Sequence, residues 1–278
     1  MCDDNQLNKA QKGVEIIGQI MRAAGDNEDV KASSKELGKT AITLTKAINN
    51  ALLPLAAVNF AFEKARIYFN ESFEIDIKEK TKDISQDDLI EPKASIAGPA
   101  LQALAFSFED KDLKEMYLNL LASSMDNNNA VNAHPAFIEI IRQLSTDEAE
   151  LLKDIFSTKL PSLPITQLRD MESSRSYTVV QEYVLNITDE NTGEPICNPD
   201  ISNMVENLIR LGLLKAEFGV QVGIPNSYEW ADKRPEIEII KNNNKHKTVT
   251  VQSIKGILSI TGLGWKFARA VGLYELYT

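Results

Sequence analysis

Two apolar stripes with helical spacing, within residues 95–144, constrain the fold of this chain more than any other feature. In both stripes the apolar side chains recur every three or four residues, which predicts amphipathic helices that pack their apolar faces into a helical core. The first stripe consists of Leu113, Met116, Tyr117, Leu120, Leu121 and Met125. The second consists of Phe137, Ile138, Ile141 and Leu144.

Capping residues predict where these helices begin. Asp110 or Ser107 can cap a helix that starts near Lys111, because a short polar side chain accepts hydrogen bonds from the first backbone N–H groups. Pro99 and Pro135 are expected near helix starts, where proline is tolerated. The tetrapeptide STDE at 145–148 has the spacing of a capping box and predicts a further helix.

The same region resembles the bacterial abortive-infection alpha family. The phrases that carry the resemblance are SIAGPALQAL at 95–104, LKEMYLNLLASSMD at 113–126, AHPAFIEIIRQLSTDEAELL at 133–152 and NLIRLGLL at 207–214. The resemblance covers roughly residues 92–272. It implies a role in the antiviral defence of a bacterium, in which an infected cell is shut down. It brings no catalytic residue to any position of this chain.

The residues after 157 differ in composition from those before, with more turn residues and β-branched residues. Pro161 and Pro164 predict a broken segment over 159–174, KLPSLPITQLRDMESS. The remaining elements expected, in order, are an extended segment at 178–187, a helix at 199–211 capped by Asn198, a strand at 214–222, a hairpin around 242–247 and a terminal helix at 261–272.

This order predicts a protein that is mainly α with a small β component. An N-terminal helical bundle is followed by a winged-helix-like α+β domain. The expected divisions are a polar segment with an amphipathic helix at 1–36, a helical domain at 37–144 and the winged-helix-like domain at 145–278.

Residues 51–62 are apolar on all sides of a helix, which is typical of a segment buried in protein or in lipid. Twelve helical residues rise about 18 Å, whereas the hydrocarbon core of a bilayer is about 30 Å thick. Pro54 interrupts the helix in addition. Burial in a helical bundle is the favoured interpretation. A standing transmembrane span and a segment that inserts on activation remain the alternatives.

The formal net charge of −10, from 30 basic and 40 acidic residues, disfavours a general role in binding phosphate. A winged helix nevertheless suggests DNA as a partner. The exposed face of the helix at 199–211 would then read bases, although a single arginine beside a glutamate reads them poorly. That face consists of Ser202, Asn203, Glu206, Asn207 and Arg210, and the hairpin would add Lys241, Lys245 and Lys247.

No group of residues has the pattern of a catalytic, metal or cofactor site. His134 precedes Pro135, so its ring is expected to satisfy a helix end or to pack, and His246 is expected in solvent. Cys2 and Cys197 are too few for a disulfide framework or a zinc site. The acidic run at 86–88 is expected to be solvated. Gly262 and Gly264 lack the third glycine of a dinucleotide fingerprint, and Trp265 and Phe267 beside them are expected in the core.

These observations favour a non-enzymatic antiviral protein without cofactors, metal or a small-molecule ligand. It would act through contact with a protein partner, through self-association, or through a conditional membrane contact of residues 51–62. The alternative function is a winged-helix DNA-binding regulator of a defence locus, although nucleic acid is the less favoured partner. The absence of a signal-like N-terminus and the two cysteines predict a cytoplasmic protein, peripheral to the membrane when activated.

Overall fold

The structure is a computed structural model, and it describes residue 48 and residues 59–171, 173, 176–189, 191–243 and 250–274, without the side chains of 59–62 and 243. Several sequence predictions lie wholly or mainly outside these residues. They concern the N-terminal helix, the apolar segment 51–62, Cys2, Lys245, His246 and Lys247.

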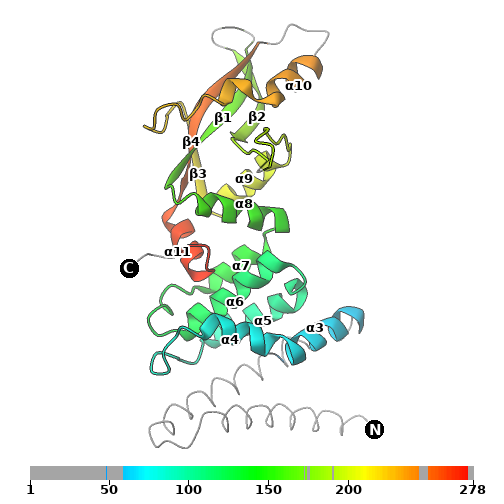
Figure 1. Cartoon of the computed structure of the whole chain (residues 1–278), viewed down its shortest axis with the longest axis vertical. Helices are drawn as coiled ribbons and strands as arrows, with labels where there is room; N and C mark the ends of the chain where they lie inside the picture. Colours follow the sequence, from blue (N-terminus) through cyan, green and yellow to red (C-terminus); the bar gives the residue numbers. More distant parts are fainter. Residues whose placement is uncertain are drawn as a thin grey trace, which may run out of the picture. The chain divides into compact units, whose positions relative to one another are not determined.

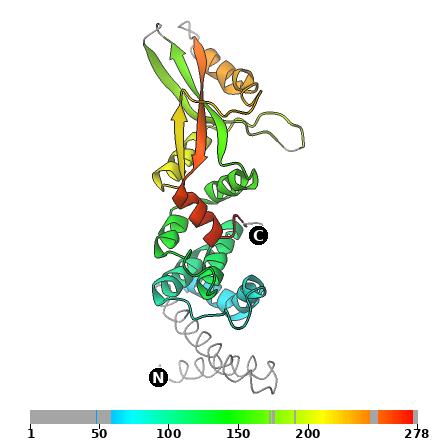
Figure 2. The ribbon, with the colours of Figure 1, turned by 90° about the vertical axis from the view of Figure 1, so that its left-hand side faces the viewer.

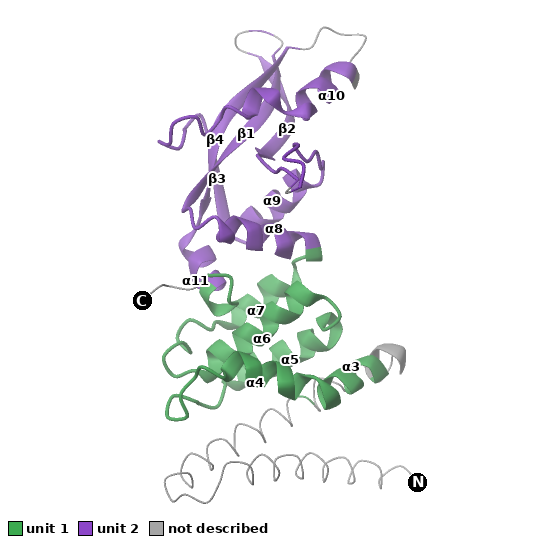
Figure 3. Cartoon of the chain, viewed as in Figure 1, with its two compact units in different colours: residues 1–146, 269–278 green, residues 147–268 purple. Residues whose placement is uncertain are grey.

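The chain divides into two compact units, one of residues 1–146 with 269–278 and one of residues 147–268 (Figure 3). The first unit is helical in its described part (Figure 1). Its helices are α3 (Asn59–Glu71), α4 (Phe73–Thr81), α5 (Ala94–Ser107), α6 (Lys111–Met125) and α7 (Pro135–Arg142).

The helices α5, α6 and α7 form the centre of the helical unit. The predicted stripes account for the packing, since Met116, Tyr117, Leu120 and Leu121 on α6 are each at most 2% exposed. Asp110 is the predicted N-cap, and its carboxylate accepts a hydrogen bond from the backbone N of Leu113 at 3.1 Å. Pro99 differs from the prediction, because it lies inside α5 rather than near its start.

The second unit is an α+β structure built on one antiparallel sheet with the strand order β2-β1-β4-β3. Figure 2 shows the strands from a second direction, with α10 beside them. The strands are β1 (Ser162–Met171), β2 (Tyr177–Leu185), β3 (Leu214–Phe218) and β4 (Val251–Ile260). The helices are α8 (Thr146–Ser157), α9 (Ile201–Arg210), the 3₁₀ turn η2 (Ala231–Lys233), α10 (Pro235–Asn243) and α11 (Gly262–Ala270).

The sheet is curled, so that its two edge strands approach each other. The rings of Tyr183 on β2 and Phe218 on β3 are stacked with their centroids 6.0 Å apart, and α9 contacts both strands. Irregular pairing between β1 and β2 accompanies the curl, with Tyr183 at φ 49°. Register shifts of this kind increase the local twist of a strand.

Two sequence predictions are wrong here. The hairpin expected around 242–247 does not form with residues 235–243, which are the helix α10. Ile237 and Ile240, three residues apart, join Leu168 and Val184 in a core cluster, and this helical spacing decides against a strand. The broken segment expected at 159–174 contains β1, which pairs with β2 only from Ile165 onward and so has no strand on that side at Pro164.

The expected combination of many helices with a smaller β component is thus confirmed. The short segments at 177–185, 201–210, 214–218 and 262–270 have the secondary structure that the sequence predicts. The winged-helix arrangement stays a prediction.

Candidate functional site

His134 caps a helix, as the sequence predicts. Its Nδ1 accepts a hydrogen bond from the backbone N of Ala136 at 3.1 Å, at the first turn of α7. Its ring centroid lies 5.9 Å from that of Phe137. The imidazole therefore satisfies one of the N–H groups that a helix start leaves without a partner inside the helix.

Of the two glycines in the TGLGW stretch, Gly264 serves packing, whereas Gly262 is exposed. A Cβ on Gly264 would lie 2.3 Å from the backbone oxygen of Leu213, so only glycine fits this close approach. The Thr261 hydroxyl accepts from the backbone N of Gly264 at 2.9 Å and starts α11. Trp265 meets Phe156 edge to face with centroids 5.4 Å apart, and Phe267 is fully buried. The predicted place in the core is confirmed for Phe267, whereas Trp265 is only partly buried.

The polar face of α9 that the sequence suggests for DNA binding makes hydrogen bonds within its own unit. Asn207 donates to the carboxylate of Glu148 at 2.8 Å. The Arg210 Nη2 donates to the Asn207 side-chain oxygen at 2.6 Å, and Ser202 donates to the backbone oxygen of Glu182. Ser202 and Asn207 thus hold α9 to its surroundings, whereas the bond from Arg210 to Asn207 lies within the helix.

Cys197 and Lys241 are the other candidates that the structure describes. The Cys197 thiol is exposed, and its pKa is raised by partial desolvation and by the nearby Glu236 carboxylate. Lys241 Nζ forms an ion pair with Glu238 at 2.9 Å on the surface of α10. Among the described residues no three acidic, histidine or cysteine side chains gather as a metal site would require.

Sequence reasoning does not single out the exposed start of β2. This strand has only β1 beside it in the sheet, so its outer backbone groups face no other strand. Residues 177–180 are all exposed, including Tyr177 (46%), Val179 (37%) and Val180 (38%). The Arg169 guanidinium lies 4.0 Å from the centre of the Tyr177 ring, which fixes this ring on the strand. We call residues 177–180 the β2 edge patch.

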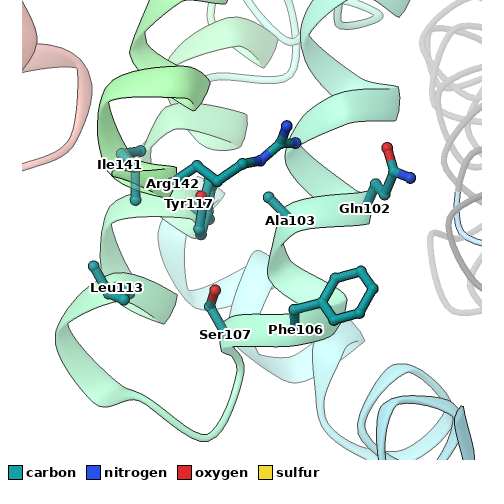
Figure 4. Close-up of a pocket in the computed structure, with 8 residues that line it drawn as sticks. All are labelled: Gln102, Ala103, Phe106, Ser107, Leu113, Tyr117, Ile141 and Arg142. Carbon is teal, nitrogen blue, oxygen red and sulfur yellow. The ribbon is translucent and has the colours of Figure 1, made fainter. Parts of the chain in front are cut away.

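The helical unit contains a pocket of about 320 Å³ between α5, α6 and α7 (Figure 4). Its apolar wall consists of Ala103, Phe106, Leu113 and Ile141, and its polar groups belong to Gln102, Ser107, Tyr117 and Arg142. Sequence reasoning assigned Leu113, Tyr117 and Ile141 to the core stripes and predicted no cavity beside them.

Tyr117 is the least expected member of this pocket. Its side chain is fully buried, yet its hydroxyl has no hydrogen-bond partner among the described residues. Burial raises the pKa of this hydroxyl, and the nearby Arg142 guanidinium opposes the rise only in part. Buried polar groups without a partner are rare in folded proteins, so the hydroxyl requires an explanation.

Within the described part of the chain, no helix combines the length and the apolar character that a membrane crossing requires. In comparisons with known proteins, the chain matches no curated protein and no solved structure. The sequence model of the family described as "abortive infection alpha" matches residues 65–271 of the 278. This match spans both units, and it includes the helical phrases that carry the resemblance. The chain therefore belongs to the abortive infection alpha family.

Proposed function

We propose that this protein serves abortive-infection defence without catalysis, by binding a protein partner or a second copy of itself through the β2 edge patch. Family membership supports the defence role. The observation that carries the contact role is the exposure of four successive residues at the start of an edge strand.

The chemistry of an edge strand supports this role. Its outer N–H and C=O groups form a row that another extended segment can pair with, and natural proteins usually protect such rows with charge or proline. The β2 edge patch, YTVV, carries neither. In β-strand addition the main chain supplies affinity and the alternate side chains supply specificity. Val179 and Val180 are both exposed, and the irregular pairing of β2 with β1 falls at Val180, so both side chains can contact an added segment.

A pair of lysine substitutions tests the proposal in infected cells. Val179→Lys and Val180→Lys place a charge at the edge, which opposes strand addition. Ile239→Lys is the matched control, because this side chain is also apolar and 47% exposed but lies on α10. We expect the two valine variants to lose protection in a phage plaque assay and the control to keep it. All three are expected to melt within a few degrees of the unchanged protein, as exposed substitutions usually do. Full protection by both valine variants would disprove the contact role.

The partner can be captured at the same place. A photoreactive phenylalanine analogue at position 178 should form a crosslink in infected cells, whereas the same group at position 239 should not. A product of twice the chain mass would identify self-association, and a different mass would identify another protein. Equal crosslinking at both positions would count against a specific contact.

If the protein acts through the β2 edge patch, we expect it not to bind DNA. Because Ser202, Asn207 and Arg210 are bonded within the unit, we expect no complex in a gel shift with operon DNA, even at low salt where phosphate contacts are strongest. A complex that Arg210→Ala abolishes would replace this proposal with the DNA-binding regulator.

A further inference from the structure

The pocket between α5, α6 and α7 brings hydrogen-bond donors together beside an apolar wall. The Tyr117 hydroxyl has no partner among the described residues. The Arg142 Nη1 donates to the Glu139 carboxylate at 3.2 and 3.4 Å. The Tyr117 hydroxyl and the Arg142 guanidinium both belong to side chains that line the same cavity (Figure 4).

The donor set indicates the charge of a ligand. A guanidinium and a phenol hydroxyl can both donate to an oxygen anion, and arginine matches the planar geometry of a carboxylate. Glu139 forms an ion pair with Arg142, which partly neutralises the positive charge at the pocket. A single negative charge is therefore better matched here than the double charge of a phosphate, which would be repelled by the Glu139 carboxylate.

The apolar lining of the pocket indicates that the rest of the ligand is apolar or aromatic. Ala103, Leu113 and Ile141 are apolar, and the Phe106 ring at the pocket is 63% exposed and available for stacking. The volume of about 320 Å³ lies at the small end of the range for ligand pockets.

From these observations we propose that the pocket binds a small monocarboxylate with an apolar or aromatic body, whose carboxylate accepts from the Tyr117 hydroxyl and the Arg142 guanidinium. The apolar body lies along Ala103, Leu113 and Ile141. The proposal does not depend on the β2 edge patch, which belongs to the other unit. It adds a ligand site that the sequence does not predict.

Titration calorimetry on the full chain tests the chemistry of the ligand, with phenylacetate as the probe. Phenylacetamide has the same shape without the charge, and inorganic phosphate has charge without the apolar body. We expect phenylacetate to bind about tenfold more tightly than phenylacetamide, because hydrogen bonds to a charged group are the stronger ones. Equal binding of the acid and the amide, or tighter binding of phosphate, would overturn the proposal.

Three substitutions locate the binding. Tyr117→Phe removes only the hydroxyl, and Arg142→Gln removes the charge; each should weaken phenylacetate binding by about tenfold or more. Ala103→Met should abolish binding by filling the cavity. Tyr68→Phe is the control, because its hydroxyl donates to Asp76 at 3.0 Å outside the pocket, and binding should be unchanged. Unchanged binding by Tyr117→Phe would overturn the proposal.

The same two tyrosine variants also separate a ligand role from a structural one. Without probe, Tyr117→Phe should melt at the same or a higher temperature, because the lost hydroxyl had no partner. Tyr68→Phe should melt at a lower temperature, because it loses a hydrogen bond. A fall in the melting temperature of Tyr117→Phe as large as that of Tyr68→Phe would show a structural hydrogen bond and refute the ligand role.

Discussion

The side-chain amide of Asn119 donates a hydrogen bond to the backbone oxygen of Val271 at 3.0 Å, across 152 residues of sequence. One turn further along α6, Ser123 donates to the backbone oxygen of Ala270 at 3.0 Å. These carbonyl groups lie at the end of α11, where a helix leaves its last carbonyl groups without partners. Two polar side chains on α6 thus hold the residues after the sheet within the helical unit.

Gly272 is essential to this contact, and we expect Gly272→Ala to destabilise the protein. Its φ is +74°, and a Cβ would lie 2.4 Å from the Asn119 amide nitrogen. The strained backbone alone should cost about 1 kcal/mol, and displacement of Asn119 should add about 1 kcal/mol for a lost hydrogen bond. Urea unfolding measures the loss. Gly193→Ala is the control, because it has φ +71° but nothing within 4 Å. Equal losses in the two variants would contradict the role of Asn119.

Asp110 is a second residue of the helical unit whose side chain we expect to contribute to the free energy of unfolding. Its carboxylate caps α6 through Leu113 N and also accepts from the Thr146 hydroxyl. Asp110→Ala should therefore lower the free energy of unfolding by about 0.5–2 kcal/mol, as the loss of an N-cap does. Asp87→Ala, in an exposed turn, should change it by less than about 0.5 kcal/mol. Thermal denaturation compares the variants, and a neutral Asp110→Ala would show that the cap contributes nothing.

Arg234 and Glu236 form a buried ion pair in the second unit, 3% and 6% exposed. The Arg234 Nη2 and Nε lie 2.6 and 2.9 Å from the two carboxylate oxygens. Nη2 also donates to the Ile196 oxygen at 2.6 Å, and Nη1 to the Ile187 oxygen at 3.2 Å. Removing one partner leaves a buried charge, so Glu236→Gln should cost about 3–5 kcal/mol.

Hydrogen exchange gives this prediction a local readout. Because Arg234 holds the carbonyl groups of Ile187 and Ile196, amides in residues 187–196 should exchange faster in Glu236→Gln. The surface pair Lys241–Glu238 provides the control, since Glu238→Gln should cost less than about 1 kcal/mol. A Glu236→Gln protein as stable as Glu238→Gln would refute the importance of the buried pair.

We expect the stability of the turn after β2 to depend on pH because of the Asp189 carboxyl. Hydrogen bonds from the backbone N of Thr192, the backbone N of Asn191 and the Thr192 hydroxyl lower the pKa of its carboxyl. A lowered pKa in the folded state means that the carboxylate stabilises the turn above the ordinary pKa of an aspartate. This stabilisation is lost as the pH falls through the folded-state pKa.

Amide chemical shifts of Asn191 and Thr192, followed from pH 7 downward, measure this transition. Its midpoint should lie below that of an unstructured aspartate, and Asp189→Asn should remove the acid-dependent change. A midpoint at the ordinary aspartate value would contradict the capping role.

The helical unit was largely predictable, because its decisive signals are local. The stripe on α6 and the cap at Asp110 lie within a few turns of each other in sequence, as do His134 and Pro135 at the start of α7. The α10 prediction failed because EIEI alternates and therefore reads as a strand. Its helical form depends on Leu168 and Val184, two residues that are distant in sequence and that pack with Ile237.

The pocket could not have been predicted from the stripe that contains it. Tyr117 has the same spacing as Met116 and Leu120, and a tyrosine in such a stripe normally finds a partner for its hydroxyl. Whether it does depends on α5 and α7, which supply Ala103 and Arg142 from other parts of the sequence. The β2 edge patch likewise depends on strand order, which no local pattern in YTVVQEYVL specifies.

The bonds from Asn119 and Ser123 also have a consequence for synthesis on the ribosome. Domains tend to fold from the N-terminus as the nascent chain emerges. Here α6 leaves the exit tunnel long before Ala270 and Val271, whose oxygens its two side chains require. These two hydrogen bonds of the helical unit can therefore form only after residues 147–268 have been translated. A polypeptide that is released before that point lacks both bonds in its N-terminal part.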